Sequence, residues 1–531
     1  MENKNATGDR ENRWSGWSTN TLATIPDVES EIEDVPPVPP IPSDSQNVPQ
    51  NNRWSGWSGK TDLSAPDHRL SGVPQEPGAA WAKDSANAHN RSKAKRIYYT
   101  VVPASSIYTP SRGEVRMHFN VSPTVALLPY SLYILGLACG CLVSSPFSEA
   151  FGRRAVYLAC TPVFALFILG SGFSQSVAAL VICRFFAGIF GGSALGLGYG
   201  TICDIWPLSD TSIPIISYIT MSLLGPVIGT LLGGLAIQLY GFRWTQWIAL
   251  YFTAANLIII LPMQETCRKS ILQRRAKREG TVDKWFHPRR KTIESIMFLL
   301  YSTVACPLSL LLEEPITGLL SLYVAFILAL FYAFFVAFPY VFASVYGFSI
   351  ASQGLTFLGL GVGCLAGFIL FSIHDRSIYK PRVTRWGAGR RAEARQKQWR
   401  LSIALPGAVL LPVSLFVFAW TARAGVHWMV PVFAEGLFSM GMLLIVCAVT
   451  LYIMDVYKPL HGAHAVASTA SLSYVLATAL SLFIVPMYER LGTRWAMTLL
   501  GVINVPFSII PLVFIKFGPG LRERTKRKNK P

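Results

Sequence analysis

Two charged side chains lie inside apolar stretches, one in each half of the chain. Arg184 falls inside a run that Asp204 closes, and Glu435 falls inside a run that Asp455 closes, at the same spacing. A charge in hydrocarbon is costly and usually faces a cavity or a partner. The pair predicts a solute pathway between two halves, in which Glu435 exchanges a proton and Arg184 modulates its affinity. A static buried pair is the alternative.

The composition predicts that most of the chain lies in a membrane, because 51% of its 531 residues are hydrophobic and only 14% are charged. A membrane-spanning helix needs roughly 20 apolar residues. Runs of about that length are 123–147, 155–173, 177–205, 213–240, 244–263, 316–341, 353–373, 401–422, 428–456, 465–485 and 495–515. They are too long and continuous for membrane strands, so the sequence predicts an all-α membrane protein.

The net charge of +18 comes from basic clusters at 91–96, 268–291, 376–400 and 516–530. Positive residues mark the cytoplasmic side of short loops, and an even number of spans puts all four clusters on that side. We therefore expect contact with anionic lipid and no binding of nucleic acid.

The runs predict two bundles of six helices joined by a basic linker, a plan common among secondary transporters. The first helix, 97–111, is short. Counting 293–312 as a span instead would place 376–400 outside, so that segment is interpreted as interfacial. The predicted parts are a disordered cytoplasmic tail (1–96), the N-terminal bundle (97–263), the linker (264–315), the C-terminal bundle (316–516) and a basic tail (517–531).

The N-terminal tail contains the heptapeptide N-R-W-S-G-W-S twice, at 12–18 and at 52–58. The repeat could dock a partner, its tryptophans could enter the membrane interface, or it could be a duplication without function. Asn120 heads a sequon close to the membrane, where glycosylation is not expected.

The sequence shows no motif of catalytic residues. Its cysteines and histidines show no zinc-site spacing, and we find no nucleophile–base pair or phosphate-binding loop. We therefore predict no enzyme, no metal and no cofactor. The partners are a small-molecule substrate, protons and lipid, and we expect a monomer.

The loop after the second span reads S-P-F-S-E-A-F-G-R-R at 145–154. A turn this tight needs Gly152, while Glu149 and Arg153 offer opposite charges that can pair with Asp204 and with a helix N-terminus. These residues predict a gate on the cytoplasmic side, with Asp455 at the corresponding place in the second half.

The fifth predicted helix, the run 213–240, reads G-P-V-I-G-T-L-L-G-G from 225 to 234. Gly225, Gly229 and Gly233 form one flat helix face that allows a neighbour to approach closely. Pro226 removes a backbone hydrogen bond and is expected to bend the helix.

The loop at 145–154 resembles a motif of the major facilitator superfamily, and the fifth predicted helix is similar to the antiporter motif of its drug exporters. With R-F-F-A-G-I-F-G-G at 184–192, E-T-C-R-K at 265–269 and L-Y-I-M-D-V-Y at 451–457, the chain looks like the fungal drug:proton antiporters with twelve spans. That resemblance implies a central cavity lined by the first, fourth, seventh and tenth helices. It would hold Arg184 and Glu435, and aromatics such as Tyr133 and Tyr332 could stack on substrates there.

The predicted function is therefore export of small amphipathic or cationic compounds, such as a drug, toxin or secondary metabolite, by proton antiport and alternating access. The alternatives are a polyamine exporter, a proton-coupled uptake carrier and a non-transporting receptor. The plasma membrane is the expected location, with the vacuolar membrane as the alternative.

Overall fold

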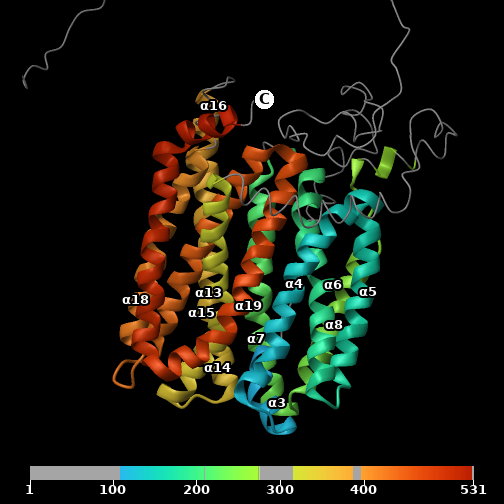
Figure 1. Cartoon of the computed structure of the whole chain (residues 1–531), viewed down its shortest axis with the longest axis vertical. Helices are drawn as coiled ribbons and strands as arrows, with labels where there is room; N and C mark the ends of the chain where they lie inside the picture. Colours follow the sequence, from blue (N-terminus) through green and yellow to red (C-terminus); the bar gives the residue numbers. More distant parts are fainter. Residues whose placement is uncertain are drawn as a thin grey trace, which may run out of the picture. The chain divides into compact units, whose positions relative to one another are not determined.

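The computed structural model describes residues 108–207, 210–268, 270–272, 274, 315–386, 396 and 398–528. All of them belong to one compact unit, Ser64–Pro531. The described part is built from helices and contains no β-strand (Figure 1). This confirms the predicted all-α architecture. The tail with its repeat, the predicted first span before Tyr108 and the segment 293–312 lie outside the described residues.

The first half begins at a short turn and continues through five long helices. Its elements are η2 (Thr109–Ser111), α3 (Arg112–Phe119), α4 (Pro123–Phe151), α5 (Arg153–Gly172), α6 (Val177–Ile205), α7 (Ser212–Tyr240) and α8 (Arg243–Ile260). The hydroxyls of Ser122 and Ser176 accept backbone N–H bonds at the starts of α4 and α6. These caps satisfy donors that the first turn leaves free.

The second half contains helical segments of very unequal length. They are α13 (Pro315–Tyr346), α14 (Ile350–Thr356), α15 (Leu358–His374), the π-helical turn η4 (Asp375–Tyr379), α16 (Lys380–Trp386), η5 (Leu401–Ile403), α18 (Ala404–Thr421) and α19 (Met429–Lys528). Within α19, Gly492 has a φ of 72°, which interrupts the helical backbone.

Nine segments of the described residues are long and apolar enough to cross a membrane. They match the predicted spans two to five and seven to twelve. The last segment, His464–Lys516, has 53 residues and includes Gly492. At 1.5 Å per residue it is about 80 Å long, enough for two crossings. The predicted sixth span corresponds to α8, which has 18 residues and is not among the nine.

Glycines bring α4 and α6 into direct backbone contact. A Cβ on Gly136 would collide with the carbonyl oxygen of Phe185, and a Cβ on Gly188 would collide with that of Tyr133. Small residues allow such close approach where lipid offers no hydrophobic driving force between helices. This contact fixes how Tyr133 on α4 lies against the start of α6.

In the described part, the two halves meet mainly where α4 packs on α19 and where α7 packs on α14 and α15. Hydroxyl groups bridge α4 and α19: Ser131 Oγ lies 3.0 Å from Ser481 Oγ, and Ser471 donates to the carbonyl oxygen of Ala138 at 3.0 Å. These neutral contacts are individually weak, so the seam can rearrange without a large cost.

Candidate functional site

The turn between α4 and α5 is built around Gly152, which has a φ of 96°. A Cβ at this position would collide with the carboxylate of Glu265 and would lie 2.8 Å from the hydroxyl of Ser270. The sequence prediction of a tight glycine turn is confirmed, and the structure adds the reason for its shape. The turn leaves room for an acid from beyond α8.

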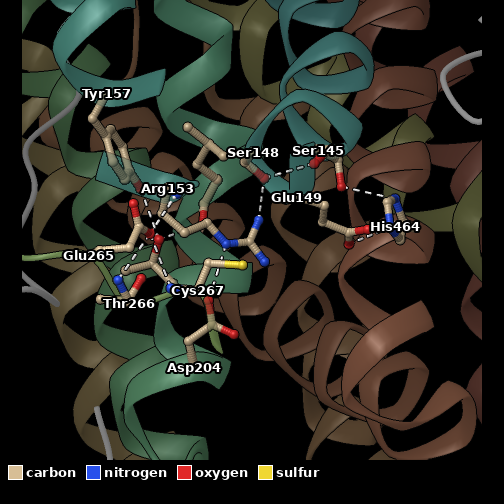
Figure 2. Close-up of polar contacts among 12 residues, drawn as sticks. Ser145, Ser148, Glu149, Arg153, Tyr157, Asp204, Glu265, Thr266, Cys267 and His464 are labelled. Carbon is tan, nitrogen blue, oxygen red and sulfur yellow. Dashed lines mark hydrogen bonds and ion pairs between the residues drawn. The ribbon is translucent and has the colours of Figure 1, made fainter. Parts of the chain in front are cut away.

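Glu265 is a buried acid that the sequence reasoning did not assign to the site. One carboxylate oxygen accepts the backbone N–H of Arg153 at 2.8 Å and those of Thr266 and Cys267 at 3.1 Å each (Figure 2). It thereby places a negative charge at the N-terminus of α5, where the helix dipole favours one. Burial raises the pKa of the Cys267 thiol, which keeps that neighbour uncharged.

Arg153 connects this turn to the end of α6. Its Nε lies 3.1 Å from Asp204 Oδ2, and its guanidinium also donates to Ser148 Oγ (Figure 2). The predicted contact between the loop and Asp204 is therefore present. All of these partners belong to the first half, so the network stiffens the end of that half.

Glu149, in contrast, reaches the other half of the molecule. Its Oε1 lies 2.8 Å from His464 Nε2, and the other ring nitrogen of His464 lies 2.9 Å from Ser145 Oγ (Figure 2). His464 belongs to α19, whereas both partners belong to α4. No sequence signal singled out His464, because histidines in a short connection between two predicted spans match no functional spacing pattern.

The second half holds an equivalent pair at its own predicted cytoplasmic end. Asp455 forms an ion pair with Arg400. Arg400 also donates to Ser212 Oγ at 2.7 Å, and Lys380 lies 3.1 Å from Asp210. Ser212 and Asp210 belong to the first half, so these contacts cross between halves as the His464 contact does. We call the His464, Arg400 and Lys380 contacts the inter-half latch.

Arg184 is buried in the first half, where its side chain is 3% exposed. One guanidinium nitrogen donates to Gln246 Oε1 at 2.5 Å, and the guanidinium carbon lies 4.3 Å from the ring centre of Tyr108 and 5.8 Å from that of Tyr133. These are cation–π distances. Its partners come from three elements of its own half.

Glu435 is buried in the second half at 1% exposure, and neither carboxylate oxygen has a hydrogen-bond partner among the residues that the structure describes. It shares a helix face with Phe438 and Ser439. Phe438 packs on Phe334 of α13, and Ser439 donates to the carbonyl oxygen of Leu360 on α15. The ion pairs of the described residues do not include one between Glu435 and Arg184. The static buried pair that the sequence analysis gave as the alternative is thus not formed among the described residues in this conformation.

The two predicted cavity tyrosines lie on either side of the seam between halves. Tyr133 faces Arg184 from α4, one helical turn after Tyr130. Tyr130 donates its hydroxyl to the carbonyl oxygen of Tyr332 on α13 at 2.8 Å, and the ring of Tyr332 packs edge-on against Tyr474. Aromatic groups from both halves therefore meet next to Arg184.

The glycine-rich helix α7 continues through Pro226 without interruption. Gly229 and Gly233 are buried, while Gly225 is half-buried. The close approach shown by the structure is at the neighbouring Gly234, whose Cβ would lie 3.0 Å from the carbonyl oxygen of Ile350. The small residues of α7 thus serve the contact between halves.

Asn120 ends α3 with a φ of 51° and is exposed. The serine of its sequon, Ser122, uses its hydroxyl to cap α4. Among the described residues, we find no group of acids, histidines and cysteines that could hold a metal ion.

Comparisons with known proteins agree on a family. A model described as Major Facilitator Superfamily matches residues 98–481. Polyamine transporter 4 of Saccharomyces cerevisiae is 34% identical over 475 residues, which cover 83% of this chain and 72% of that protein. Fluconazole resistance protein 1 of the same yeast is 32% identical, with 79% and 77% covered. The ascochitine biosynthesis cluster MFS transporter of Didymella fabae is 31% identical, with 83% and 87% covered.

A solved structure shares the fold. It is that of the human organic anion transporter MFSD10 (TETRAN), with a TM-score of 0.50 and 17% sequence identity over 76% of this chain and 89% of that one.

Proposed function

Because the chain belongs to the major facilitator superfamily of membrane transporters, we propose that it exports small amphipathic compounds from the cytoplasm in exchange for protons. Its substrates would be drugs, toxins or secondary metabolites, and it would work as a monomer in the plasma membrane. The names of two relatives, a fluconazole resistance protein and a transporter of a biosynthesis cluster, support export.

The observation that carries proton exchange is the environment of Glu435. An ionised carboxylate without a hydrogen bond is unstable in an apolar interior, so the buried side chain is best satisfied when it carries a proton. When the half opens to water, the carboxylate can release that proton. A group that must change its charge as its surroundings change can couple proton movement to alternating access.

The inter-half latch supports the conformational part of the proposal. In this conformation it joins the two halves at the end predicted to face the cytoplasm. A compound from the cytoplasm could enter only after these contacts break. Since they are few and polar, substrate binding could supply the free energy for opening.

Proteoliposomes test the exchange directly. Purified protein is reconstituted, and proton release from the acidic lumen is followed when 1-naphthoate, fluconazole or rhodamine 6G is added outside. We expect at least one compound to accumulate only while the pH gradient persists. Accumulation should be lost in Glu435→Gln, whereas accumulation without a gradient, or unchanged in this variant, would contradict the proposal.

Asp375→Asn is the matched control. Asp375 is the other deeply buried acid of the second half with a carboxylate oxygen that lacks a hydrogen bond, at 2% exposure. It lies in η4 at the predicted cytoplasmic end. Removing its charge should leave the dependence on the gradient intact.

Polyamine export is the second candidate, since one relative carries that name. A polycation needs several acids, whereas α13 (Pro315–Tyr346) carries no acidic residue. Spermidine in the same proteoliposome assay would distinguish the two candidates, because gradient-driven accumulation of spermidine would favour polyamine export.

A further inference from the structure

We propose that Arg184 and Tyr108 form a binding site for an anionic group, a carboxylate or its equivalent, on the exported compound. The inference rests on the proposed function and narrows its substrates to amphipathic acids. Its basis is the positive charge of Arg184 in the first half.

Among the described residues, the positive charge of Arg184 has no acidic partner. Its one hydrogen bond within that part of the chain goes to the neutral amide of Gln246, and its Nε makes none there. The ion pairs of the described residues all involve other side chains. A buried charge without a counter-charge is strongly unfavourable. The cluster therefore lacks a negative charge to balance Arg184, and a bound anion would supply it.

The donors of the cluster suit a carboxylate. A guanidinium presents its N–H groups in a planar fork that matches two carboxylate oxygens. Tyr108 is 2% exposed, and in the described part of the chain its hydroxyl also has no hydrogen-bond partner. Its ring lies against the guanidinium at 4.3 Å. Two unused donors are thus present in one buried cluster.

A second layer of hydrogen bonds holds these donors in position. Gln246 accepts from Arg184 while its amide nitrogen donates to Thr245 Oγ1 at 3.1 Å. Thr245 Oγ1 in turn lies 3.3 Å from the Oγ of Ser111, the last residue of η2. With the orientation of Gln246 fixed in this way, Arg184 has one nitrogen anchored and the rest of its fork available, so less entropy is lost when an anion binds.

The cluster is adjacent to the seam that alternating access would open. Tyr133 contacts Arg184, and Tyr130, one turn away on α4, contacts Tyr332 of the other half. A compound whose acidic group reaches Arg184 would therefore place its apolar part among these tyrosines. A cation would be repelled by the guanidinium at this end of the site.

Equilibrium binding to the purified full-length protein at pH 7, without any proton gradient, tests the site. The probes are 1-naphthoate, its neutral analogue 1-naphthamide and the cation 1-naphthylmethylammonium. We expect naphthoate to bind at least about tenfold more tightly than either analogue, the order of a charge-assisted hydrogen bond. Equal binding of the three probes, or no naphthoate binding, would overturn the inference.

Variants locate the site. Arg184→Gln should abolish the preference for naphthoate, Arg184→Lys should retain part of it, and Tyr108→Phe should weaken it several-fold. Arg243→Gln is the control, because Arg243 is an exposed arginine on the neighbouring α8. If Arg184→Gln does not fold, the probe comparison in the wild-type protein still decides. An unchanged naphthoate preference in a folded Arg184→Gln protein would also refute the assignment.

The two proposals fail in different ways. If naphthoate binds through Arg184 but no compound is driven by the gradient, only proton-coupled export fails. If rhodamine 6G is exported by the gradient and naphthoate does not bind, only the anion site fails.

Discussion

Replacing His464 by alanine removes a contact between the halves while leaving each half intact. The imidazole bonds Glu149 at 2.8 Å and Ser145 at 2.9 Å, both on α4. The side chains of His464 and Glu149 are 18% and 34% exposed, so water partly screens the pair. Its loss should favour a conformation in which the cytoplasmic ends are apart.

The expected size follows from these two bonds. A partly exposed hydrogen bond with one charged partner contributes about 1 kcal/mol after screening. Removing both therefore shifts the equilibrium by about 1–2 kcal/mol, or roughly 5- to 30-fold toward the open form. The Arg400 and Lys380 contacts of the latch remain, so a closed population should persist.

Distances between spin labels would measure the shift. In a cysteine-free background, labels at Phe151→Cys and Thr384→Cys would report on the cytoplasmic ends of the two halves, since both positions are exposed. We expect His464→Ala to increase the population at longer distance. His427→Ala is the matched control, because His427 is an exposed histidine near the start of the first α19 span. Identical distributions for wild type and His464→Ala would refute the latch.

Three further substitutions test the turn, the helix contact and the buried acid. Gly152→Ala should lower the melting temperature, since a side chain at a φ of 96° costs about 1–2 kcal/mol and its Cβ displaces Glu265. Gly113→Ala is the control, because nothing lies within 4 Å of a Cβ at that position. Gly188→Ala should destabilise by separating α4 from α6, measured by the same thermal melts. Glu265→Gln should lower the free energy of unfolding by about 1–3 kcal/mol, because it weakens the bonds to three backbone N–H groups. Glu265→Ala should lower it further, and a stability equal to that of the wild type would contradict this role of Glu265.

Hydropathy was sufficient to predict most of the spans, because length and apolar content decide which segments can cross a membrane. Charge and glycine positions likewise predicted the turn at Gly152 and its contact with Asp204. These predictions succeed because the interactions are local or lie at the ends of adjacent helices.

The partners of Glu265, Arg400 and His464 could not be predicted from sequence. Arg400 was counted with a basic cluster, and only the folded structure shows that it reaches Ser212 at the start of α7. The absence of an Arg184–Glu435 pair has the same origin. Spacing places both charges at similar depth, but helix rotation decides the face on which each lies. The Gly136–Gly188 contact sets that rotation for α6.

The two arginine–aspartate pairs look equivalent by position, yet their remaining contacts give them different roles. Besides its aspartate, Arg153 donates a hydrogen bond to Ser148 within the first half, whereas Arg400 donates one to Ser212 in the other half. Asp204→Asn should therefore lower the melting temperature without changing the label distance.

Asp455→Asn should lower the melting temperature and also change the label distance. It leaves Arg400, whose side chain is 9% exposed, without the acid that orients it. An Arg400→Met/Asp455→Asn double variant should recover stability but not the closed distance, because the bond to Ser212 is still missing. Equal effects of the two single variants on the label distance would show instead that the halves are held together by packing of α4 and α7, and that neither arginine controls the opening.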